Sequence, residues 1–217
     1  MINEGNMRDY INSYNSSHGT SFAFWDHGYN ADGLTDPSGD STGTSYDIPG
    51  DNTDPDGLFT LWTTANSART SIMSNHQVIA FKSCFPNSAI SDAAILQQYK
   101  DWYLAMRNYF DQHSEKLFVV ISTPPLTPLE TNITEAANAR AFANWLKSST
   151  YLSGHPNMVC FDLFNYLAKA NDGSAGANML KLEYRGSDPN DSHPNALANQ
   201  TVGPIFAQFL IDSAKNY

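Results

Sequence analysis

A histidine with an acidic residue shortly before it stands directly ahead of the last helix-like stretch of this chain. The run is Asp188-Pro189-Asn190-Asp191-Ser192-His193-Pro194-Asn195. A nucleophilic hydroxyl needs a base to take its proton, and the base needs an acid to hold its tautomer. A carboxylate two residues before a histidine in a tight loop meets that need by local geometry. The run predicts His193 as a general base, oriented by Asp191 or by Asp188; a solvated surface turn is the alternative.

A turn that carries an asparagine follows one of the apolar runs. Ser83-Cys84-Phe85-Pro86-Asn87-Ser88 comes shortly after Val78–Phe81. An amide here, with a backbone N–H nearby, can hydrogen-bond the negative oxygen that develops when an ester is attacked. Pro86 and Asn87 also build a turn that needs no function, so both interpretations stay open at this point.

The elements that must position these residues alternate between apolar runs and segments of helical period. This is the pattern of a parallel sheet with helices on its faces. The predicted strands are 21–25, 78–81, 117–121 and 158–161, and the predicted helices are 2–14, 58–75, 91–110, 134–146 and 195–214. Ser91 and Asp92 are the expected cap of the third helix and Thr134 that of the fourth. Residues 26–57, crowded with Gly, Pro, Asp, Asn and Ser, are expected to be mostly loop.

Taken together, the order of the elements, the asparagine turn and the Asp-Ser-His-Pro-Asn block resemble the SGNH (GDSL-like) hydrolases, from about Phe22 to the end of the chain. The resemblance implies a single α/β domain over residues 1–217. Its expected form is a three-layer α/β/α sandwich with a mostly parallel, flavodoxin-like sheet. It also implies hydrolysis of small acyl esters, acylated carbohydrate among them, by a serine nucleophile without a metal or other cofactor.

The resemblance also assigns roles residue by residue. His193 becomes the base, Asp191 the orienting acid and Asn87 the asparagine of the oxyanion hole. The glycine that completes the oxyanion hole is Gly28 or Gly33. The family's last block is usually Asp-x-x-His, whereas position 190 here is Asn, so Asp191 at a spacing of two is the nearest acid.

The nucleophile is the larger departure from the family pattern. In the family, the serine lies in a Gly-Asp-Ser turn that follows an apolar first strand. Gly39-Asp40-Ser41 spells this motif, but it lies inside the loop-rich stretch with no strand before it. Ser41 is therefore one candidate. The preferred expectation is that the chain is incomplete at its N-terminus, where the strand and its serine would precede Met1.

Composition limits the partners. The 217 residues carry 12 Lys plus Arg against 22 Asp plus Glu, a formal net charge of −10. An acidic surface repels phosphate backbones and anionic lipid headgroups, so nucleic acid and membranes are not expected partners. No apolar run approaches the roughly 20 residues of a membrane span. Many Asn, Ser and Thr with few basic residues favour an extracytoplasmic protein. Cys84 and Cys160 are expected to be buried free thiols; a disulfide and a nucleophilic Cys84 are the alternatives.

Two other motifs have competing interpretations. Asn52-Thr53-Asp54-Pro55-Asp56-Gly57 resembles the opening of a calcium loop, but Thr63 stands where the final glutamate belongs, which favours an acidic loop at the edge of a cleft. The histidines other than His193 show no metal-ligand spacing, so no metal site is expected. The alternative to an esterase is a catalytically inactive module of the same fold that binds carbohydrate or protein.

Overall fold

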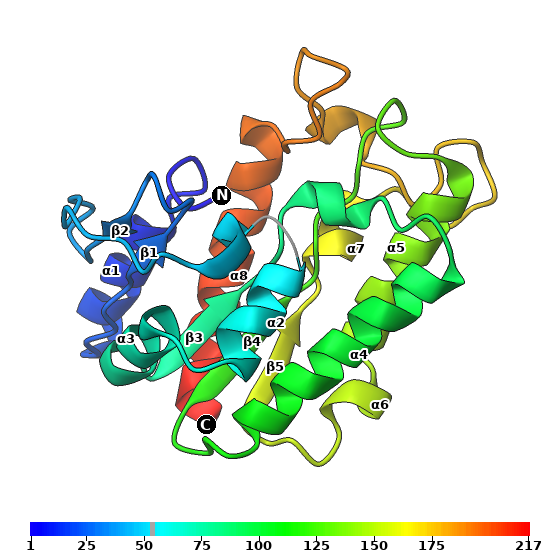
Figure 1. Ribbon diagram of the computed structural model, residues 1–217. Coiled ribbons are helices and arrows are strands. Elements are labelled where there is room, and N and C mark those ends of the chain that lie inside the picture. Colours follow the sequence, from blue (N-terminus) through cyan, green and yellow to red (C-terminus); the bar gives the residue numbers. More distant parts are fainter. Residues whose placement is uncertain (53–54) are drawn as a thin grey trace.

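A parallel three-stranded sheet forms the centre of the protein in the computed structural model, which describes residues 1–52 and 55–217 (Figure 1). The strands are β3 (Val78–Phe81), β4 (Leu117–Ile121) and β5 (Met158–Phe161), in the order β3-β4-β5. Val78 pairs with Leu117, and Phe118 pairs with Met158. The three strands were predicted at these bounds, and the mixed α/β class is confirmed.

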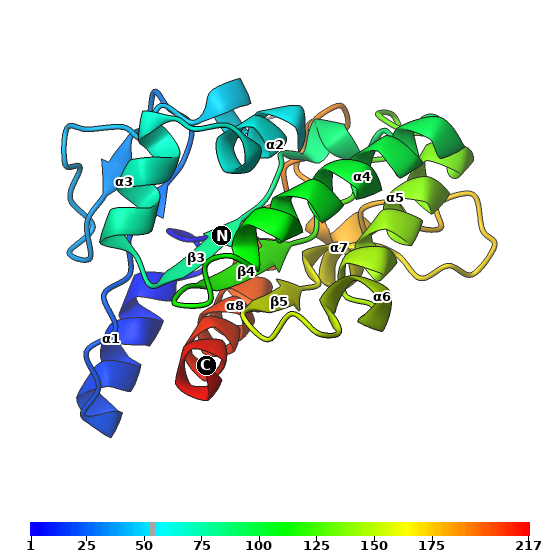
Figure 2. The ribbon, with the colours of Figure 1, turned by 60° about the horizontal axis from the view of Figure 1, so that its bottom comes forward.

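The alternation of side chains along β4 divides the interior into two apolar clusters. Phe118 and Val120 point to one face of the sheet, and Leu117, Val119 and Ile121 point to the other. All five are buried, because helices cover both faces. Figure 2 shows the sheet between these two groups of helices.

The helices on the first face are α2 (Pro55–Thr63), α3 (Ser67–Asn75), α4 (Ala93–Phe110), α5 (Ile133–Leu146) and α6 (Ser149–Leu152). Those on the second face are α1 (Met7–His18) and α8 (Ala196–Asn216), and α7 (Leu163–Leu167) follows β5. Short 3-10 turns are η1 (Pro49–Asn52), η2 (Phe85–Ser88) and η3 (Leu182–Tyr184). None of the helices among the described residues is long and apolar enough to cross a membrane.

Capping side chains explain where the predicted helices begin and end. Asp92 accepts hydrogen bonds from the N–H groups of Ala94 and Ile95, as expected for the cap of α4. The predicted helix over 58–75 is interrupted, because Asn66 accepts from Arg69 N–H and starts α3 as a separate helix. The cap predicted at Thr134 was wrong: Asn132 caps α5 in a reciprocal capping box with Glu135.

The strand predicted over residues 21–25 is also wrong. The segment forms no ladder; its described backbone bonds join only Phe22 to the side chain of Asn15. The alternating apolar residues Phe22 and Phe24 instead pack partly against the second cluster. The two-residue strands β1 (Asp26–His27) and β2 (Leu34–Thr35) follow as an antiparallel pair. The rest of 26–52 is mostly loop and turns, as predicted for this part of 26–57.

The outer edge of β3 has no strand beside it within the described residues. Among the described residues β3 pairs with β4 alone, so the backbone groups of Val78 and Ala80 that point away from β4 form no backbone bond there. Lys82 follows directly, and its ammonium group donates weakly to the carbonyl oxygen of Ser83 at 3.4 Å. Burial lowers the pKa of Lys82, while the neighbouring Cys84 raises it. An unpaired sheet edge is a site to which a further strand can add.

Close packing of two glycines fixes α8 against the N-terminal residues. A Cβ atom on Gly203 would lie 2.6 Å from the carbonyl oxygen of Gly5 and 2.7 Å from its Cα. We expect Gly203→Ala to lower the free energy of unfolding by about 1–3 kcal/mol, because the clash is with backbone. This loss would exceed the gain of roughly 1 kcal/mol in helix propensity.

Urea unfolding followed by circular dichroism measures this difference. Gly186→Ala is the matched control, since a Cβ there meets nothing within 4 Å. Equal stability of the two variants would contradict the close contact between α8 and Gly5.

Candidate functional site

The loop that carries His193 is held at the start of α8 by an asparagine. Asn195 caps the helix by accepting from Ala198 N–H at 3.0 Å. Its own side-chain amide donates to the carbonyl oxygens of Glu183 and Arg185 at 2.9 and 2.8 Å. One side chain thus fixes both the first turn of α8 and the direction from which the loop enters it.

Asp191 and His193 form a hydrogen-bonded pair in this loop. The carboxylate oxygen Oδ1 of Asp191 lies 2.6 Å from Nδ1 of His193 and also accepts the His193 backbone N–H at 2.8 Å. These bonds hold the pKa of Asp191 below its ordinary value. Asp188 instead accepts from the N–H of Asn190 in its own turn. Asp191 is therefore the orienting partner of His193, and the other ring nitrogen, Nε2, faces away from that bond.

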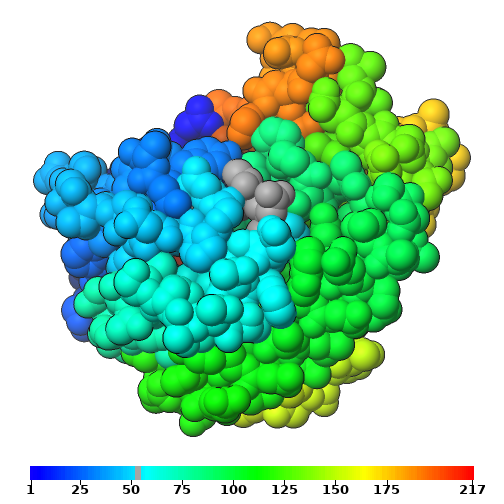
Figure 3. All heavy atoms as spheres, in the orientation of Figure 1, coloured from blue at the N-terminus to red at the C-terminus, as the bar shows by residue number. Residues whose placement is uncertain are grey.

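A buried serine between these two residues ties the loop to the rest of the protein. Ser192 is 0% exposed, and its Oγ accepts the backbone N–H of Thr127 at 2.9 Å. Thr127 Oγ1 in turn donates to the carbonyl oxygen of Pro189 at 3.0 Å. Thr127 lies in the segment that follows β4, and Figure 3 shows the two segments side by side, the loop before α8 in orange and the segment after β4 in green. Ser192 lies inside the predicted motif, but the sequence pattern does not distinguish it as a positioning residue.

The turn that follows β3 supplies the other neighbour of His193. The ring of Phe85 lies 4.6 Å from the His193 ring, nearly perpendicular to it at 81°. Ser88 anchors this turn, because its buried Oγ donates to the carbonyl oxygen of Pro124 at 2.7 Å. Asn87 lies between these two residues, 5% exposed, and its amide donates to the carbonyl oxygen of Cys84 at 3.4 Å. The turn thus brings the predicted oxyanion-hole asparagine within two residues of a direct contact of His193.

Other predicted site residues are not in contact with His193 within the described part of the chain. Ser41 is exposed and bridges to Thr35 of β2, and its Oγ accepts the N–H of Gly43 at 3.3 Å. Figure 1 shows β2 at the left of the molecule, away from the loop before α8 at the top. Gly33 has a structural reason to be glycine, since its φ is +71° and a Cβ would lie 2.7 Å from the carbonyl oxygen of Thr44. Gly28 lies in the same region, just after β1.

Both cysteines are free, as predicted, but neither is fully buried, whereas buried thiols were expected. Cys84 is partly exposed and lies 3.3 Å from the hydroxyl of Tyr29, a contact that raises the pKa of Tyr29 to about 12. Burial raises the pKa of the Cys160 thiol to about 12, so Cys160 is poorly reactive. Cys84 is thus the only one of the two thiols that lies next to the candidate site.

A further prediction concerns the acidic run that resembles a calcium loop. The calcium-like run from Asn52 to Gly57 contains Thr53 and Asp54, which lie outside the described residues. No group of three or more His, Cys, Asp or Glu side chains that could hold a metal ion is present in the described residues.

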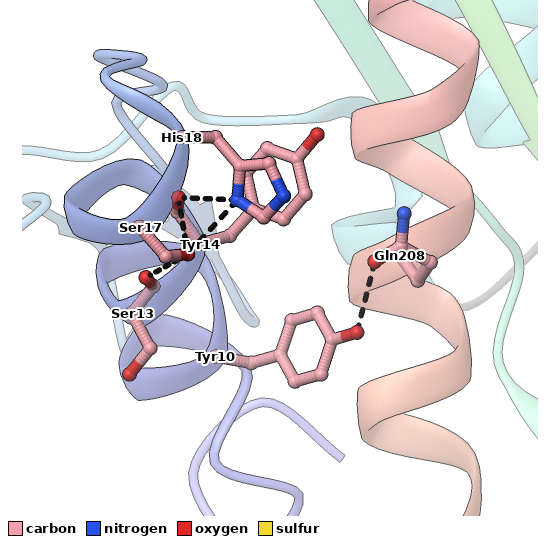
Figure 4. A pocket seen from close by; sticks show the side chains of 6 residues that line it. All are labelled: Tyr10, Ser13, Tyr14, Ser17, His18 and Gln208. Atoms are coloured by element: carbon pink, nitrogen blue, oxygen red, sulfur yellow. Dashed lines mark hydrogen bonds between the residues drawn. The ribbon is translucent and has the colours of Figure 1, made fainter.

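A groove of about 480 Å³ lies elsewhere, between α1 and α8, and Figure 4 shows its lining side chains. The hydroxyl of Ser17 lies 2.8 Å from Nδ1 of His18, but it donates to the carbonyl oxygens of Ser13 and Tyr14. The His18 ring stacks on Tyr14 with centroids 4.0 Å apart. No described carboxylate contacts His18, so the groove lacks the acid–base pair that Asp191 and His193 form.

Comparison with protein-family models, with curated proteins and with solved structures gives no significant match. The fold and the site therefore define only a broad class: an α/β protein with an Asp–His pair beyond the carboxyl ends of a parallel sheet. The resemblance to the SGNH hydrolases stays a prediction that rests on the residues of the two blocks.

The buried bond of Ser192 generates a test of how the His193 loop is held. Ser192→Ala leaves the N–H of Thr127 buried without an acceptor, which we expect to lower the free energy of unfolding by roughly 1–3 kcal/mol. Urea unfolding measures this loss. Ser153→Ala is the control, because Ser153 is exposed and such changes stay within about 0.5 kcal/mol. A loss no larger than that of the control would contradict the tethering role.

The contact with Phe85 predicts how the imidazole is oriented. The His193 side chain is 59% exposed, so Asp191 and Phe85 are its main described constraints. In Phe85→Leu, the carbon-bound protons of the His193 ring should lose the ring-current shift of a neighbouring aromatic ring, while Phe85→Tyr should keep it. NMR spectra of the two variants measure this shift. Phe59→Leu removes a ring that stacks on Trp102 and serves as control; unchanged His193 signals in Phe85→Leu would contradict the contact.

Proposed function

We propose that this protein is an ester hydrolase of the SGNH type, which acts on small acyl esters, acylated carbohydrate among them. The observation that carries the proposal is the hydrogen bond between Nδ1 of His193 and the accepting carboxylate of Asp191, beside the turn that contains Asn87. Ligands of open parallel sheets bind beyond the carboxyl ends of the strands, and both segments lie there. The finer fold, a flavodoxin-like SGNH sandwich, is part of the same proposal.

In the proposed reaction, His193 takes the proton of a serine hydroxyl through Nε2 while the serine oxygen attacks the acyl carbon. Asp191 holds the proton on Nδ1 and stabilises the imidazolium that forms. Asn87 hydrogen-bonds the tetrahedral oxyanion. The alcohol leaves with the proton from His193, and a water molecule, deprotonated by His193, then releases the acid and the free serine.

The serine remains to be assigned, because no hydroxyl among the described residues contacts the His193 ring. We propose that it ends a strand that pairs with the outer edge of β3. Val78 and Ala80 present backbone groups to such a strand. The carboxyl ends of parallel strands meet at one edge of a sheet, so a strand parallel to β3 would end beside the turn of Phe85 and Asn87.

A fluorophosphonate probe tests the proposal on two proteins: the chain itself, and the chain extended ahead of Met1 by a short apolar strand that ends in Gly-Asp-Ser. We expect the probe to label the added serine, and the extended protein to hydrolyse p-nitrophenyl acetate. His193→Ala in that protein should lower turnover by a factor on the order of 10⁴ or more. Mass spectrometry locates the adduct.

Controls separate the possible nucleophiles. Replacing the added serine by alanine should abolish labelling, whereas an adduct on Ser41 would make Ser41 the nucleophile instead. If the extended protein folds cooperatively but neither reacts with the probe nor hydrolyses the ester, the hydrolase proposal is wrong. A binding module is then the remaining function, with the groove between α1 and α8 as its first candidate site.

A further inference from the structure

Two adjoining cavities form a trough between α1 and α8. The larger, of about 480 Å³, is the groove described above, and a second of about 260 Å³ continues it towards the start of α8. Tyr10 and Ser13 line both cavities, so the two are parts of one depression. Figure 4 shows Tyr10 reaching from α1 across to Gln208 of α8. The volume is in the range of small-molecule binding sites, about 300–1,000 Å³.

Three contacts hold the two helices at a fixed separation along this trough. The contact between two glycines described above fixes the end nearer the start of α8. In the middle, the hydroxyl of Tyr10 donates to Oε1 of Gln208 at 2.8 Å. Farther along, Nζ of Lys215 donates to the hydroxyl of Tyr14 at 2.9 Å. The trough is therefore formed before a ligand arrives, which reduces the entropic cost of binding.

Four polar side chains that line the trough are free to bond a ligand. They are Asn6, Asp9 and Ser13 at the start of and along α1, and Gln200 of α8. No hydrogen bond joins any of these four side chains to another described residue. The three on α1 follow one another at intervals of three and four residues, which places them on one face of the helix. Three of the four carry hydroxyl or carboxamide groups, which both donate and accept hydrogen bonds.

The chemistry of the lining selects an uncharged ligand that is rich in hydroxyl groups. None of the described lining residues is Lys or Arg, whereas Glu4 and Asp9 are acidic, and the chain has a net charge of −10. An anionic ligand is therefore repelled. The large apolar surfaces are confined to the rings of Tyr10 and Tyr14 and to Pro204, too few for a wholly apolar ligand. The C–H groups of a sugar ring can contact the negative face of a tyrosine ring while its hydroxyls bond the polar side chains.

The trough is longer than one sugar ring, and it begins beside the loop of the candidate site. From Gln200 to Gln208, α8 extends by about 12 Å at about 1.5 Å per residue. At the upper end, the side-chain amide of Asn199 donates to the carboxylate of Glu4 and, at 3.3 Å, to the carbonyl oxygen of Pro194. Pro194 belongs to the loop before α8 that carries the candidate base. One side chain thus connects the end of the trough with that loop.

We propose that the trough between α1 and α8 binds a neutral oligosaccharide. Tyr10 supplies its aromatic floor, and Ser13 and Gln200 supply hydrogen bonds from the two sides. The binding does not depend on the hydrolysis proposed above, so the failure of either proposal leaves the other standing. If both hold, the trough binds the saccharide part of an acylated carbohydrate.

NMR titration of the isotope-labelled chain with cellotetraose, xylotetraose and maltotetraose tests the proposal. At least one of these neutral sugars should shift the amide signals of α1 and α8 beside the trough in a saturable way. Titration to about 10 mM detects dissociation constants up to the order of 1 mM. The tetramer of galacturonic acid, which carries carboxylates, should cause no such shifts. Gln200→Ala, a change at an exposed position, should weaken binding about 2- to 10-fold, the loss expected for one hydrogen bond.

A tryptophan placed in the trough provides the decisive variant. Ser13→Trp fills the point where the two cavities meet and should abolish the shifts. Asn12→Trp is the matched control, because Asn12 is the neighbouring exposed residue of α1 and lines neither cavity. Circular dichroism shows whether both variants fold, and Gln200→Ala tests the same trough if Ser13→Trp does not. The absence of saturable shifts with all three neutral sugars would overturn the proposal. So would undiminished binding by a folded Ser13→Trp or by Gln200→Ala, or binding of the galacturonic acid tetramer alone.

Discussion

The burial of β4 on both faces is the constraint on which the rest of the structure depends. Leu117 to Ile121 are all buried, and their alternation sends apolar side chains into two separate clusters. Such a strand cannot be exposed on either face without the loss of roughly 1.5–3 kcal/mol for each large side chain. Helices must therefore cover both faces, and the parallel pairing of β3 and β5 with β4 brings the carboxyl ends of all three strands to one edge. The turn after β3 and the segment after β4 therefore begin at that edge, where they meet the loop before α8.

Buried hydrogen bonds then fix the positions of the site segments with respect to one another. Ser88 joins the turn after β3 to Pro124, and Ser192 joins the His193 loop to Thr127. Pro124 and Thr127 both belong to the segment after β4. This segment is thus the common support of the asparagine turn and of the Asp–His pair. A buried donor that loses its acceptor costs more than a surface bond contributes, so these two serines restrict the site more strongly than the exposed contact of Asp191 with His193 does.

The sequence predicted those features that depend on local pattern. The strands Val78–Phe81, Leu117–Ile121 and Met158–Phe161 are short runs of β-branched, aromatic and other apolar residues between turn signals, and each was found at its predicted bounds. The pairing of Asp191 with His193 is also local, since only Ser192 separates them. The predicted strand over 21–25 shows the limit: its pattern alternates correctly, but a strand needs a neighbour that supplies backbone partners, and none lies beside it among the described residues. Ser192 and Phe85 were missed for a related reason, because their roles come from contacts with Thr127 and His193 that only the tertiary structure creates.

The open edge of β3 and the nucleophile of the proposed hydrolase call for the same element, a strand that pairs with β3 and carries a serine at its end. A strand parallel to β3 satisfies the backbone groups of Val78 and Ala80 and ends near Lys82, Phe85 and Asn87. A carboxylate or other anionic group at that end would also meet the ammonium group of Lys82, whose one hydrogen bond among the described residues is the 3.4 Å contact with the carbonyl oxygen of Ser83. A serine in an exposed loop, such as Ser41, supplies neither a strand that pairs with the edge of β3 nor an anionic partner for Lys82. The geometry of the sheet therefore favours a nucleophile that arrives on a strand over one that reaches the histidine from a loop.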